Sequence, residues 1–424
     1  METPNRLWNR SFTLLWQGQL ASSLGKNAFQ VGALLWLKDA TGSGTLSGLV
    51  GGLAMLPMVL LGPIAGVFVD RVNRGRMVAW TDVAGGALVS AAAVLFLVMP
   101  TRTPLLLGAV FVVTLATGLL DTFSQPSITA SLPDLVPRAK LEAANGLNLA
   151  VLHVAMLVAQ GAAGLVYNFL GAPLLVVANA IAYLWAGFTE LGVRTPDRPR
   201  SAPSRHPWRQ FASEFNEGAR FVWQHRGMRT MLLLFMAMNL FVTPLLALMA
   251  FFVEDYLGLG HAWLGYLMAC FGAGGLAGFA LAGAIRVRGR GRLALLAGAT
   301  IGQSTMVMLV LALRPVATQI AGFFAAGIFG GIMSVHINTL LQTASPPELR
   351  GRVQSLSTTL SVAVMPVGMA LAGVVFDLSG RSFLVIGVAG ALMLASSVAA
   401  LFFREYRRFL SGAAEPIAKV TIAA

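Results

Sequence analysis

The sequence predicts an all-α integral membrane protein whose twelve transmembrane helices form two pseudo-symmetric six-helix bundles. The chain is 56% hydrophobic and only 11% charged, whereas an average soluble chain is about 25% charged. Its apolar segments run for about 20 to 30 residues without the period-two alternation of barrel strands. Because lipid offers no hydrogen-bond partners to an exposed backbone, such segments cross a membrane as helices. An internal sequence repeat divides these helices into two sets.

The apolar segments lie between clusters of charged residues, proline and glycine, six before and six after one long polar stretch. They predict an N-terminal bundle over 1–193, a cytoplasmic linker over 194–228, a C-terminal bundle over 229–404 and a cytoplasmic tail over 405–424. The predicted spans are 11–38, 45–69, 76–99, 103–132, 140–169, 172–193, 229–257, 262–285, 292–313, 316–344, 352–377 and 382–403.

The distribution of lysine and arginine predicts the orientation of these spans. Loops that stay in the cytoplasm carry an excess of positive side chains. If both termini are cytoplasmic, the outer loops hold only Lys38, Arg102, Arg314 and Arg381, and Lys26 lies inside a span. We therefore expect a multi-pass protein of a bacterial cytoplasmic (inner) membrane, with both termini inside. We expect no removable signal peptide before the first span.

The linker contains a second pattern, in which apolar and charged residues alternate with a helical period. This pattern predicts an amphipathic helix that lies along the inner membrane surface, and a merely flexible linker is the alternative. The apolar face holds Trp208, Phe211, Phe215 and Val222, and the opposite face holds Arg209, Glu217 and Arg220.

The two halves repeat each other in sequence. The stretch Gly161–Gly171 matches Ala370–Gly380, and the same offset pairs Pro137 with Pro346. A fixed offset between matching segments is typical of duplicated transporter halves. The sequence therefore predicts two parallel six-helix repeats.

Composition excludes several other classes of protein. Cys270 is the single cysteine, which excludes a disulfide framework and a multi-cysteine metal site. The net charge of +13 is scattered over short loops, so we expect no nucleic-acid partner. The histidines lack metal-ligand spacing, and neither a nucleophile–base set nor a phosphate-binding loop is present. We therefore expect neither enzyme activity nor a cofactor or bound metal.

A glycine-rich motif with several charges follows the second span. Its glycines lie on one helical face and permit close helix packing, and its charges can hold the end of a neighbouring helix. Such a conformational latch would hold one state and open in another, whereas the alternative is an ordinary positive inner loop. Asp82 is assigned to the same network rather than to a cavity. The latch residues are Gly62, Gly66, Asp70, Arg71, Arg74, Arg76 and Asp82.

This motif, on twelve spans with a central loop, resembles the major facilitator superfamily over nearly the whole chain. Gly18–Gly25 with Thr41–Ser43, and Gln125–Pro126 leading to Leu132–Pro137, are similar to the drug-exporter branch typified by macrolide-efflux proteins. The resemblance implies a central cavity between the halves, alternating access and, usually, proton-coupled export. Three departures from the family pattern are Lys26 where an acid is usual, Ala159-Gln160 where Gly-Pro is usual, and Arg286 where the second latch copy has Asp.

Polar side chains deep in the first half are candidate binding residues, because an ionisable group in mid-membrane needs a cavity or a partner. Gln19, Ser23, Lys26 and Gln30 form one stripe of the first span. Lys26 is a candidate to bind an anionic substrate group or to form a structural ion pair, and an engineered or incidental replacement remains the third reading.

Three titratable residues are candidates for proton coupling. Asp121 is the deepest acid, but Lys26 is able to pair with it and keep it ionised. His153 and His336 are candidate relays, and hydrogen-bonded packing is the alternative for each. Asp121 and His153 are also candidate substrate-binding residues, and the further candidates are Gln125, Gln160, Met236, Asn239, Thr243, Gln354 and Thr358.

We therefore expect a monomeric secondary transporter in the lipid bilayer, exporting small lipophilic or amphiphilic molecules in exchange for protons. A dedicated transporter of an anionic amphiphile, such as a lysophospholipid or siderophore, is the first alternative. A non-transporting membrane scaffold or lipid scramblase is the second.

Overall fold

The computed structural model describes residues 6–69, 72–195, 207–285, 287, 289–346 and 349–412, and these residues form helices and no strands. The chain divides into two compact units. The first unit comprises Met1–Trp208 together with Met249–Ala269, and the second comprises Arg209–Leu248 and Cys270–Ala424. The segment Met249–Ala269 therefore belongs to the first unit, although it follows the linker in the chain.

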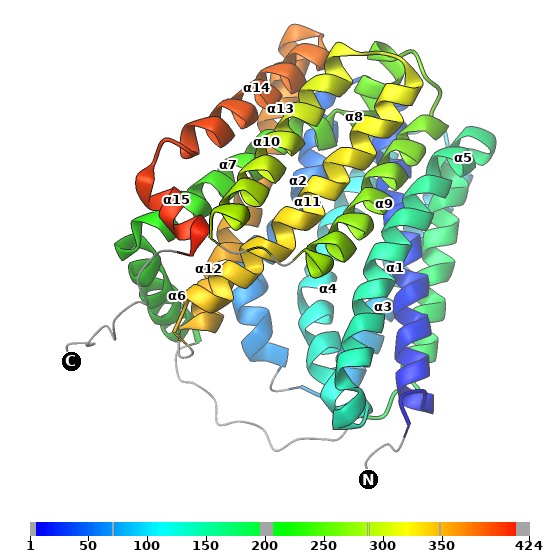
Figure 1. Cartoon of the computed structure of the whole chain (residues 1–424). Coiled ribbons are helices and arrows are strands. Elements are labelled where there is room, and N and C mark those ends of the chain that lie inside the picture. The colour runs from blue at the N-terminus through cyan, green and yellow to red at the C-terminus, as the bar shows by residue number, and fades with distance from the viewer. Residues whose placement is uncertain are drawn as a thin grey trace. The chain divides into compact units, whose positions relative to one another are not determined.

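The first unit contains five long helices, coloured blue to green in Figure 1. Within it α1 and α3 pack against α5, and α4 packs against α2 and α3. Its remaining elements are short and include the π-helical turn η2. The elements are α1 (Arg10–Thr41), α2 (Gly44–Val69), α3 (Arg74–Val98), α4 (Thr103–Leu135), η1 (Arg138–Lys140), α5 (Leu141–Glu190), α8 (Met249–Phe251) and η2 (Phe252–Tyr256).

The ends of α1 are set by local hydrogen bonds. Asn9 caps the N-terminus, because its side chain accepts a hydrogen bond from the backbone N–H of Phe12. At the other end Gly42 adopts φ 60°, and its N–H donates to the carbonyl of Lys38. Because α1 runs without a break between these caps, the polar residues of the first predicted span lie on one continuous helix.

Helix α5 contains two predicted spans in one element. Its geometry breaks at Gly171, with φ 72° and ψ −179°, two residues before Pro173. A residue with a side chain is strained at this φ, whereas glycine is not. Gly171 thus divides α5 at the boundary predicted between 140–169 and 172–193.

The second unit is built around α7, which packs against α12, α13, α14 and α15 (Figure 1). A second set of contacts joins α10 to α11, α14 and α15. Pro366 follows the break between α12 and α13, so the predicted span 352–377 is two consecutive helices. The elements are α6 (Pro207–Gln224), α7 (Arg226–Ala247), α10 (Arg290–Ala312), α11 (Val316–Ala344), α12 (Arg350–Ala363), α13 (Met365–Ser379), α14 (Ser382–Ala400) and α15 (Arg404–Ser411); α9 (Ala262–Ala284) begins in the first unit and continues in the second.

Helix α6 is the amphipathic segment expected in the linker. Phe221 and Val222 are buried in the core of the second unit, and Phe215 packs against that core. On another face Glu217 forms an ion pair with Arg352 of α12. The side chains of Trp208, Arg209 and Phe211 lie outside the described residues.

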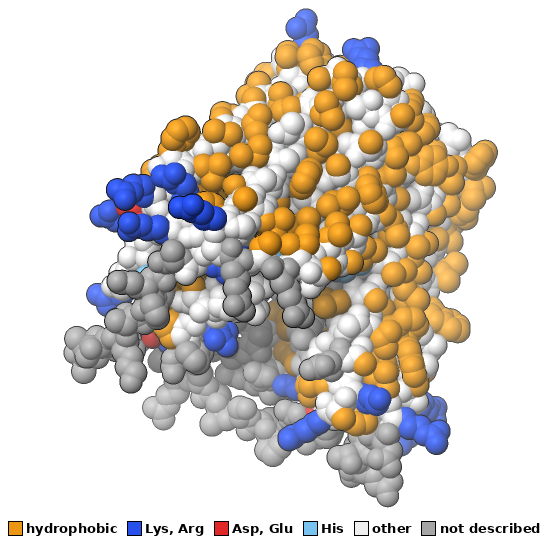
Figure 2. Space-filling model, viewed as in Figure 1, with side chains coloured by type: hydrophobic (Ala, Val, Ile, Leu, Met, Phe, Trp, Pro, Cys, Tyr) orange, Lys and Arg blue, Asp and Glu red, His pale blue; other side chains and the backbone are white. Residues whose placement is uncertain are grey.

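The outer surfaces of the helices are apolar enough to face the hydrocarbon core of a lipid bilayer. On the face shown in Figure 2 apolar side chains cover the helices, and Lys and Arg gather near helix ends. Phe169, Leu378 and Phe402 are all more than 70% exposed, which is unfavourable in water but not in lipid. Among the described residues ten helices are long and apolar enough to span a membrane. The more polar α1 and the division of α5 at Gly171 account for the twelve predicted spans.

Candidate functional site

An ion pair between α1 and α4 lies in the first unit. The Nζ atom of Lys26 is 2.5 Å from Oδ1 of Asp121. The side chain of Lys26 is 20% exposed and that of Asp121 is 34% exposed, so the pair borders accessible space. The Nζ atom also lies 4.9 Å from the ring centroid of Tyr183 in α5, at the distance of a cation–π contact. The sequence left open whether Lys26 binds substrate, forms a structural ion pair or is an incidental replacement, and the structure shows it in an ion pair.

Two further carboxyl groups lie beside this pair and are almost completely buried. Asp82 of α3 and Glu190 of α5 are each 1% exposed. The Asp82 carboxyl group interacts with the side chains of Ser22 and Glu190, and the charges of Lys26 and Asp121 act on it. Glu190 Oε1 accepts a hydrogen bond of 2.9 Å from Gln19 Nε2. We call Gln19, Ser22, Lys26, Asp82, Asp121, Tyr183 and Glu190 the polar cluster.

The polar cluster carries more negative than positive groups. Lys26 supplies one positive charge and is paired with Asp121, which leaves Asp82 and Glu190 without a cation of their own in the cluster. Two neighbouring carboxylates are costly to bury when both are ionised, and a shared proton removes most of that cost. Asp82 Oδ2 and Glu190 Oε2 are also buried, and neither atom has a hydrogen-bond partner among the described residues. This pair of carboxyl groups is therefore suited to bind and release one proton.

Glycine residues make room for the polar cluster between the helices. A Cβ atom on Gly18 of α1 would lie 2.6 Å from Glu190 Oε1. A Cβ atom on Gly85 of α3 would lie 2.8 Å from the ring of Tyr183. Larger residues at either position would push the polar side chain away, so these glycines bring α1 and α3 close to α5.

The other predicted residues of the first unit are spread around the polar cluster. Ser23 is buried and Gln30 is exposed. Gln160 Nε2 donates a 3.2 Å hydrogen bond to Asn27 Oδ1, which joins α5 to α1. His153 Nδ1 contacts the carbonyl of Leu149 at 2.9 Å. Gln125 is half-buried on α4, one turn beyond Asp121.

The predicted residues of the second unit show one direct contact between two helices. Gln354 Nε2 donates a 2.7 Å hydrogen bond to Asn338 Oδ1 and so joins α12 to α11. Thr243 is fully buried, and a Cβ atom on Gly368 would collide with its hydroxyl oxygen. The remaining polar groups bond to backbone carbonyls of their own helices: Asn239 to Phe235, Thr358 to Gln354, and the ring of His336 to Ile332. Met236 is half-buried on α7.

The structure describes only some residues of the predicted latch. Arg74 Nη1 donates to the carbonyl of Ala130 at 2.7 Å and lies 3.4 Å from Asp134 Oδ2, so it holds the C-terminal end of α4. Arg76 is exposed, and its backbone N–H is capped by Asn73. Gly62 and Gly66 belong to α2, whereas Asp70 and Arg71 lie outside the described residues. Asp82, assigned to the latch from its position in the chain, lies in the polar cluster.

Sequence reasoning missed Glu190 and Tyr183. Both residues lie in the predicted span 172–193. Their spacing held a signal, because Asn179, Tyr183 and Glu190 fall on one helical face at intervals of four and seven residues. All three residues are 1% exposed.

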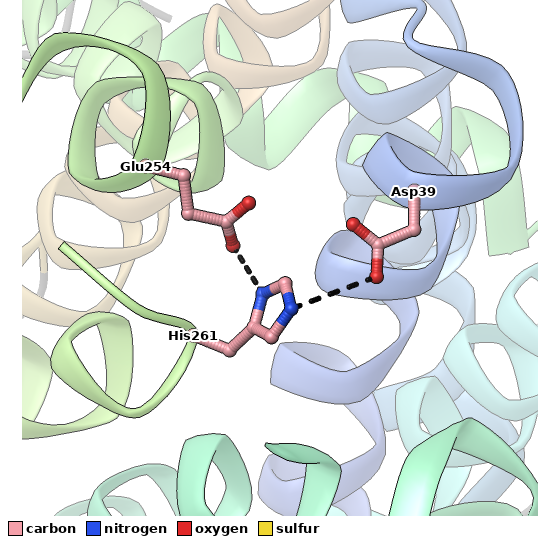
Figure 3. Close-up of side chains that lie close together, drawn as sticks. All are labelled: Asp39, Glu254 and His261. Carbon is pink, nitrogen blue, oxygen red and sulfur yellow. Dashed lines mark hydrogen bonds and ion pairs between the residues drawn. The ribbon is translucent and has the colours of Figure 1, made fainter. Parts of the chain in front are cut away.

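A second group of titratable residues lies at the C-terminal end of α1. Asp39, Glu254 and His261 place potential metal-ligand atoms within 4.8 Å of one another. Figure 3 shows the imidazole between the two carboxylates. No sequence pattern pointed to this group, because Asp39 lies far along the chain from the other two residues.

Two helical units with apolar surfaces define an integral membrane protein, and a partly accessible charged cluster lies inside its first unit. A model of the Major Facilitator Superfamily matches residues 15–369. The chain belongs to this superfamily, as the sequence motifs predicted.

Similar proteins support the same fold and branch. Macrolide efflux protein A of Streptococcus pyogenes is 24% identical over 95% of this chain and 98% of its own length. Multidrug efflux pump Tap of Mycobacterium tuberculosis is 28% identical over 82% of this chain and 83% of its own. The crystal structure of the nucleoside transporter NupG covers 93% of this chain and 99% of its own, with a TM-score of 0.75 at 11% identity. The predicted resemblance to macrolide-efflux proteins is confirmed.

Proposed function

We propose that this transporter exports lipophilic or amphiphilic small molecules by alternating access, in exchange for protons. Relatives named as a macrolide efflux protein and a multidrug efflux pump support export of such compounds. The observation that carries the proton part is the buried pair Asp82 and Glu190 next to the Lys26–Asp121 ion pair. Buried, interacting carboxyl groups are typical of proton relays in transporters.

The polar cluster suggests how cargo and proton exchange are linked. Asp121 is the most accessible carboxylate of the cluster, so a cationic or polar cargo group would compete with Lys26 for it. An ammonium group displaced from Asp121 remains near Tyr183 and Asp82. A positive charge closer to Asp82 favours loss of the proton shared with Glu190. Cargo binding would then promote proton release.

An anionic amphiphile is the weaker candidate cargo. Lys26 is already neutralised by Asp121 at 2.5 Å, so an anionic head group would have to displace a carboxylate that is held at contact distance. The proposed exchange predicts better transport of cationic and neutral lipophiles than of anionic ones.

Transport by the full chain in lipid vesicles tests this proposal. We expect an imposed pH gradient to drive uphill movement of a macrolide and of a lipophilic cation. Asp82→Asn with Glu190→Gln should abolish uphill transport while cargo exchange without a gradient continues. Ser90→Ala is a matched control on α3, because the hydroxyl of Ser90 donates a 2.7 Å hydrogen bond to the carbonyl of Gly86, one turn away on the same helix.

Three results would contradict the proposal. Uphill transport that survives in the Asp82→Asn, Glu190→Gln variant would remove the carboxyl pair from coupling. Movement of anionic amphiphiles alone would favour the dedicated carrier, and lipid flipping without cargo movement under any gradient would favour the scramblase.

We also propose that both termini face the cytoplasm, as the positive side chains of the loops predict. A reporter protein that fluoresces only in the cytoplasm, fused after residue 424, should then be bright. A dark fusion with normal expression would reverse the orientation.

A further inference from the structure

The short helix α15 has one buried face and one charged face. Tyr406, Phe409 and Leu410 are buried in the core of the second unit. Because these residues follow the helical spacing, they share one side of α15 and leave the opposite side to other residues. The residues on that opposite side are exposed, and they are Arg404, Arg407 and Arg408.

Close contacts hold α15 against α7 and α10. A Cβ atom on Gly227, at the start of α7, would lie 2.5 Å from Phe409 Cβ, so the two helices touch there. Arg292 Nε of α10 donates a 2.8 Å hydrogen bond to the carbonyl of Leu410 in the last turn of α15. This bond satisfies one of the carbonyl groups that a helix C-terminus leaves without an internal partner. The arginines of α15 are therefore presented by a packed helix.

Positive charge gathers where α15 meets α7 and α10. These three helices together contain seven arginines and a single acidic residue, Glu405. The carboxylate of Glu405 lies 3.8 Å from the guanidinium group of Arg226 and can balance only one of these charges. In Figure 2 the Lys and Arg side chains gather over α15, and apolar side chains cover the helices beside it. The seven arginines are Arg226, Arg229, Arg290, Arg292, Arg404, Arg407 and Arg408.

Exposed aromatic side chains border these arginines. Phe402 and Phe403 connect α14 to α15, and both are exposed. Trp223 of α6 is also exposed, and the guanidinium carbon of Arg229 lies 5.9 Å from its ring centroid. Helix α14 is long and apolar enough to span a membrane, so its end lies where the hydrocarbon meets the lipid headgroups. Aromatic rings next to arginines are typical of this boundary.

We propose that Arg226, Arg229, Arg404, Arg407 and Arg408, which we call the arginine patch, bind the headgroup of an anionic phospholipid. A guanidinium group can form two parallel hydrogen bonds to a phosphate, so arginine suits this ligand. Clusters of basic residues directly after a membrane span are typical of sites for anionic lipids.

The exposed phenylalanines beside the arginine patch favour a lipid over a soluble acidic partner. Phe402 and Phe403 lie between the membrane span and the patch, where they contact the acyl chains of the bound lipid. A soluble acidic protein supplies negative charge but no such chains. The site is separate from the polar cluster, and it depends neither on the cargo nor on the orientation of the chain in the membrane.

Thermal unfolding of the full chain in detergent tests the proposal. A ligand that binds the folded state raises Tm, and the lipid concentration that gives half of the maximal rise reports its affinity. We compare phosphatidylglycerol with phosphatidylcholine of the same acyl chains. Each basic side chain near an anionic headgroup strengthens binding by about fivefold, so phosphatidylglycerol should bind at least about tenfold more tightly. Equal affinities for the two lipids would overturn the proposal.

Substitutions in α15 locate the site. Arg404→Gln, Arg407→Gln and Arg408→Gln combined should weaken phosphatidylglycerol binding at least about tenfold and leave phosphatidylcholine binding unchanged. The same three positions changed to lysine keep their charge but lose the paired hydrogen bonds, so this variant should lose less affinity. A lysine variant as weak as the glutamine variant would overturn the role of charge.

A matched control removes three exposed arginines from the ends of other helices. It should bind phosphatidylglycerol as tightly as the unsubstituted protein, although it loses the same net charge. A loss equal to that of the glutamine variant of α15 would show general charge attraction and overturn the proposal. The control combines Arg102→Gln, Arg138→Gln and Arg381→Gln.

Two further measurements keep the proposal decidable. If the triple glutamine variant does not fold, Arg407→Gln alone should weaken phosphatidylglycerol binding by about fivefold, and an unchanged affinity would overturn the proposal. Inorganic phosphate without lipid should leave Tm unchanged. If phosphate raises Tm as much as phosphatidylglycerol does, and Arg407→Gln weakens both effects, the arginine patch binds a free anion and the lipid site is overturned.

Discussion

Gln19 donates a hydrogen bond of 2.9 Å to Glu190, and both side chains are buried where α1 meets the end of α5. The bond occupies one oxygen of the Glu190 carboxyl group, and the other, Oε2, has no hydrogen-bond partner in the part of the chain that the structure describes. Glu190 also interacts with Asp82, so we expect Gln19 to influence how the two carboxyl groups share a proton.

Substitution of Gln19 should therefore change the pH dependence of transport. Gln19→Leu removes the donor to Glu190, and an unsatisfied buried acceptor costs about 1–3 kcal/mol. We expect protonation of the pair to become easier, so the transport rate should fall off at a higher pH than in the unsubstituted protein. Initial transport rates between about pH 5 and 9 measure this shift.

Gln17→Leu is the control for this experiment, since Gln17 lies on the same helix and is half-buried. Equal pH profiles for Gln19→Leu and Gln17→Leu would show that Gln19 does not tune the carboxyl pair.

The Lys26–Asp121 ion pair should show coupling in a double-mutant cycle. Lys26→Met and Asp121→Asn each leave one charge near the membrane interior without its 2.5 Å partner, whereas the double variant removes both charges. We expect the double variant to be more stable than the sum of the two single effects by about 1 kcal/mol. Thermal unfolding in the same detergent measures all four proteins, and additive effects would mean that the pair contributes no stability.

Arg74 and Arg76 should differ, although both belong to the predicted latch. Arg74 holds the end of α4 through Ala130 and Asp134, whereas Arg76 is exposed. Loss of a hydrogen bond from a charged donor costs about 1.5–3 kcal/mol. Arg74→Ala should therefore lower transport by about tenfold if the latch stabilises one state of the cycle, and Arg76→Ala should change it less than twofold. Similar rates for the two variants would remove the special role of Arg74.

A pair of glycine substitutions tests the contact between α1 and α5. A Cβ atom on Gly25 would lie 2.7 Å from Asn179 Oδ1 and 2.8 Å from Ala182 Cβ, whereas a Cβ atom on Gly108 meets no atom within 4 Å. Gly25→Ala should destabilise the protein by about 1–3 kcal/mol through overpacking. Gly108→Ala should be neutral or stabilising by up to about 1 kcal/mol, because alanine favours a helix. Unfolding temperatures distinguish the two, and equal values would show that the helices do not pack this closely.

The spans and the family could be predicted because they depend on local composition. Apolar length identified each helix, and even the division of α5 at Gly171 fell where glycine and Pro173 interrupt the apolar run. The family motif depends on residues adjacent in the chain, and the match over 15–369 confirmed it.

The site could be predicted only in part. Helical periodicity shows which residues share one face of a helix, but it does not show which other helix packs against that face. The stripe of Gln19, Ser23, Lys26 and Gln30 was expected to face one cavity. In the structure Gln19 is buried against Glu190, Lys26 meets Asp121, and Gln30 is exposed. Residues far apart in the chain decide each of these environments. The contact between Asp82 and Glu190 could not be predicted for the same reason, since the two residues lie on different helices.

The segment Met249–Ala269 belongs to the first unit, so a cut in the linker separates this segment from the helix α5 that it contacts. A fragment that stops in the linker would lack the residues that cover Gly161 and Gly164 of α5, whose close neighbours are Ala269, His261 and Ala262. If the chain is cut between 196 and 206 and the two polypeptides are co-expressed, they should reassemble only when Met249–Ala269 of the C-terminal polypeptide packs against the N-terminal one. The N-terminal fragment alone should be degraded rapidly by proteases, because the surface of α5 around Gly161 and Gly164 would be uncovered.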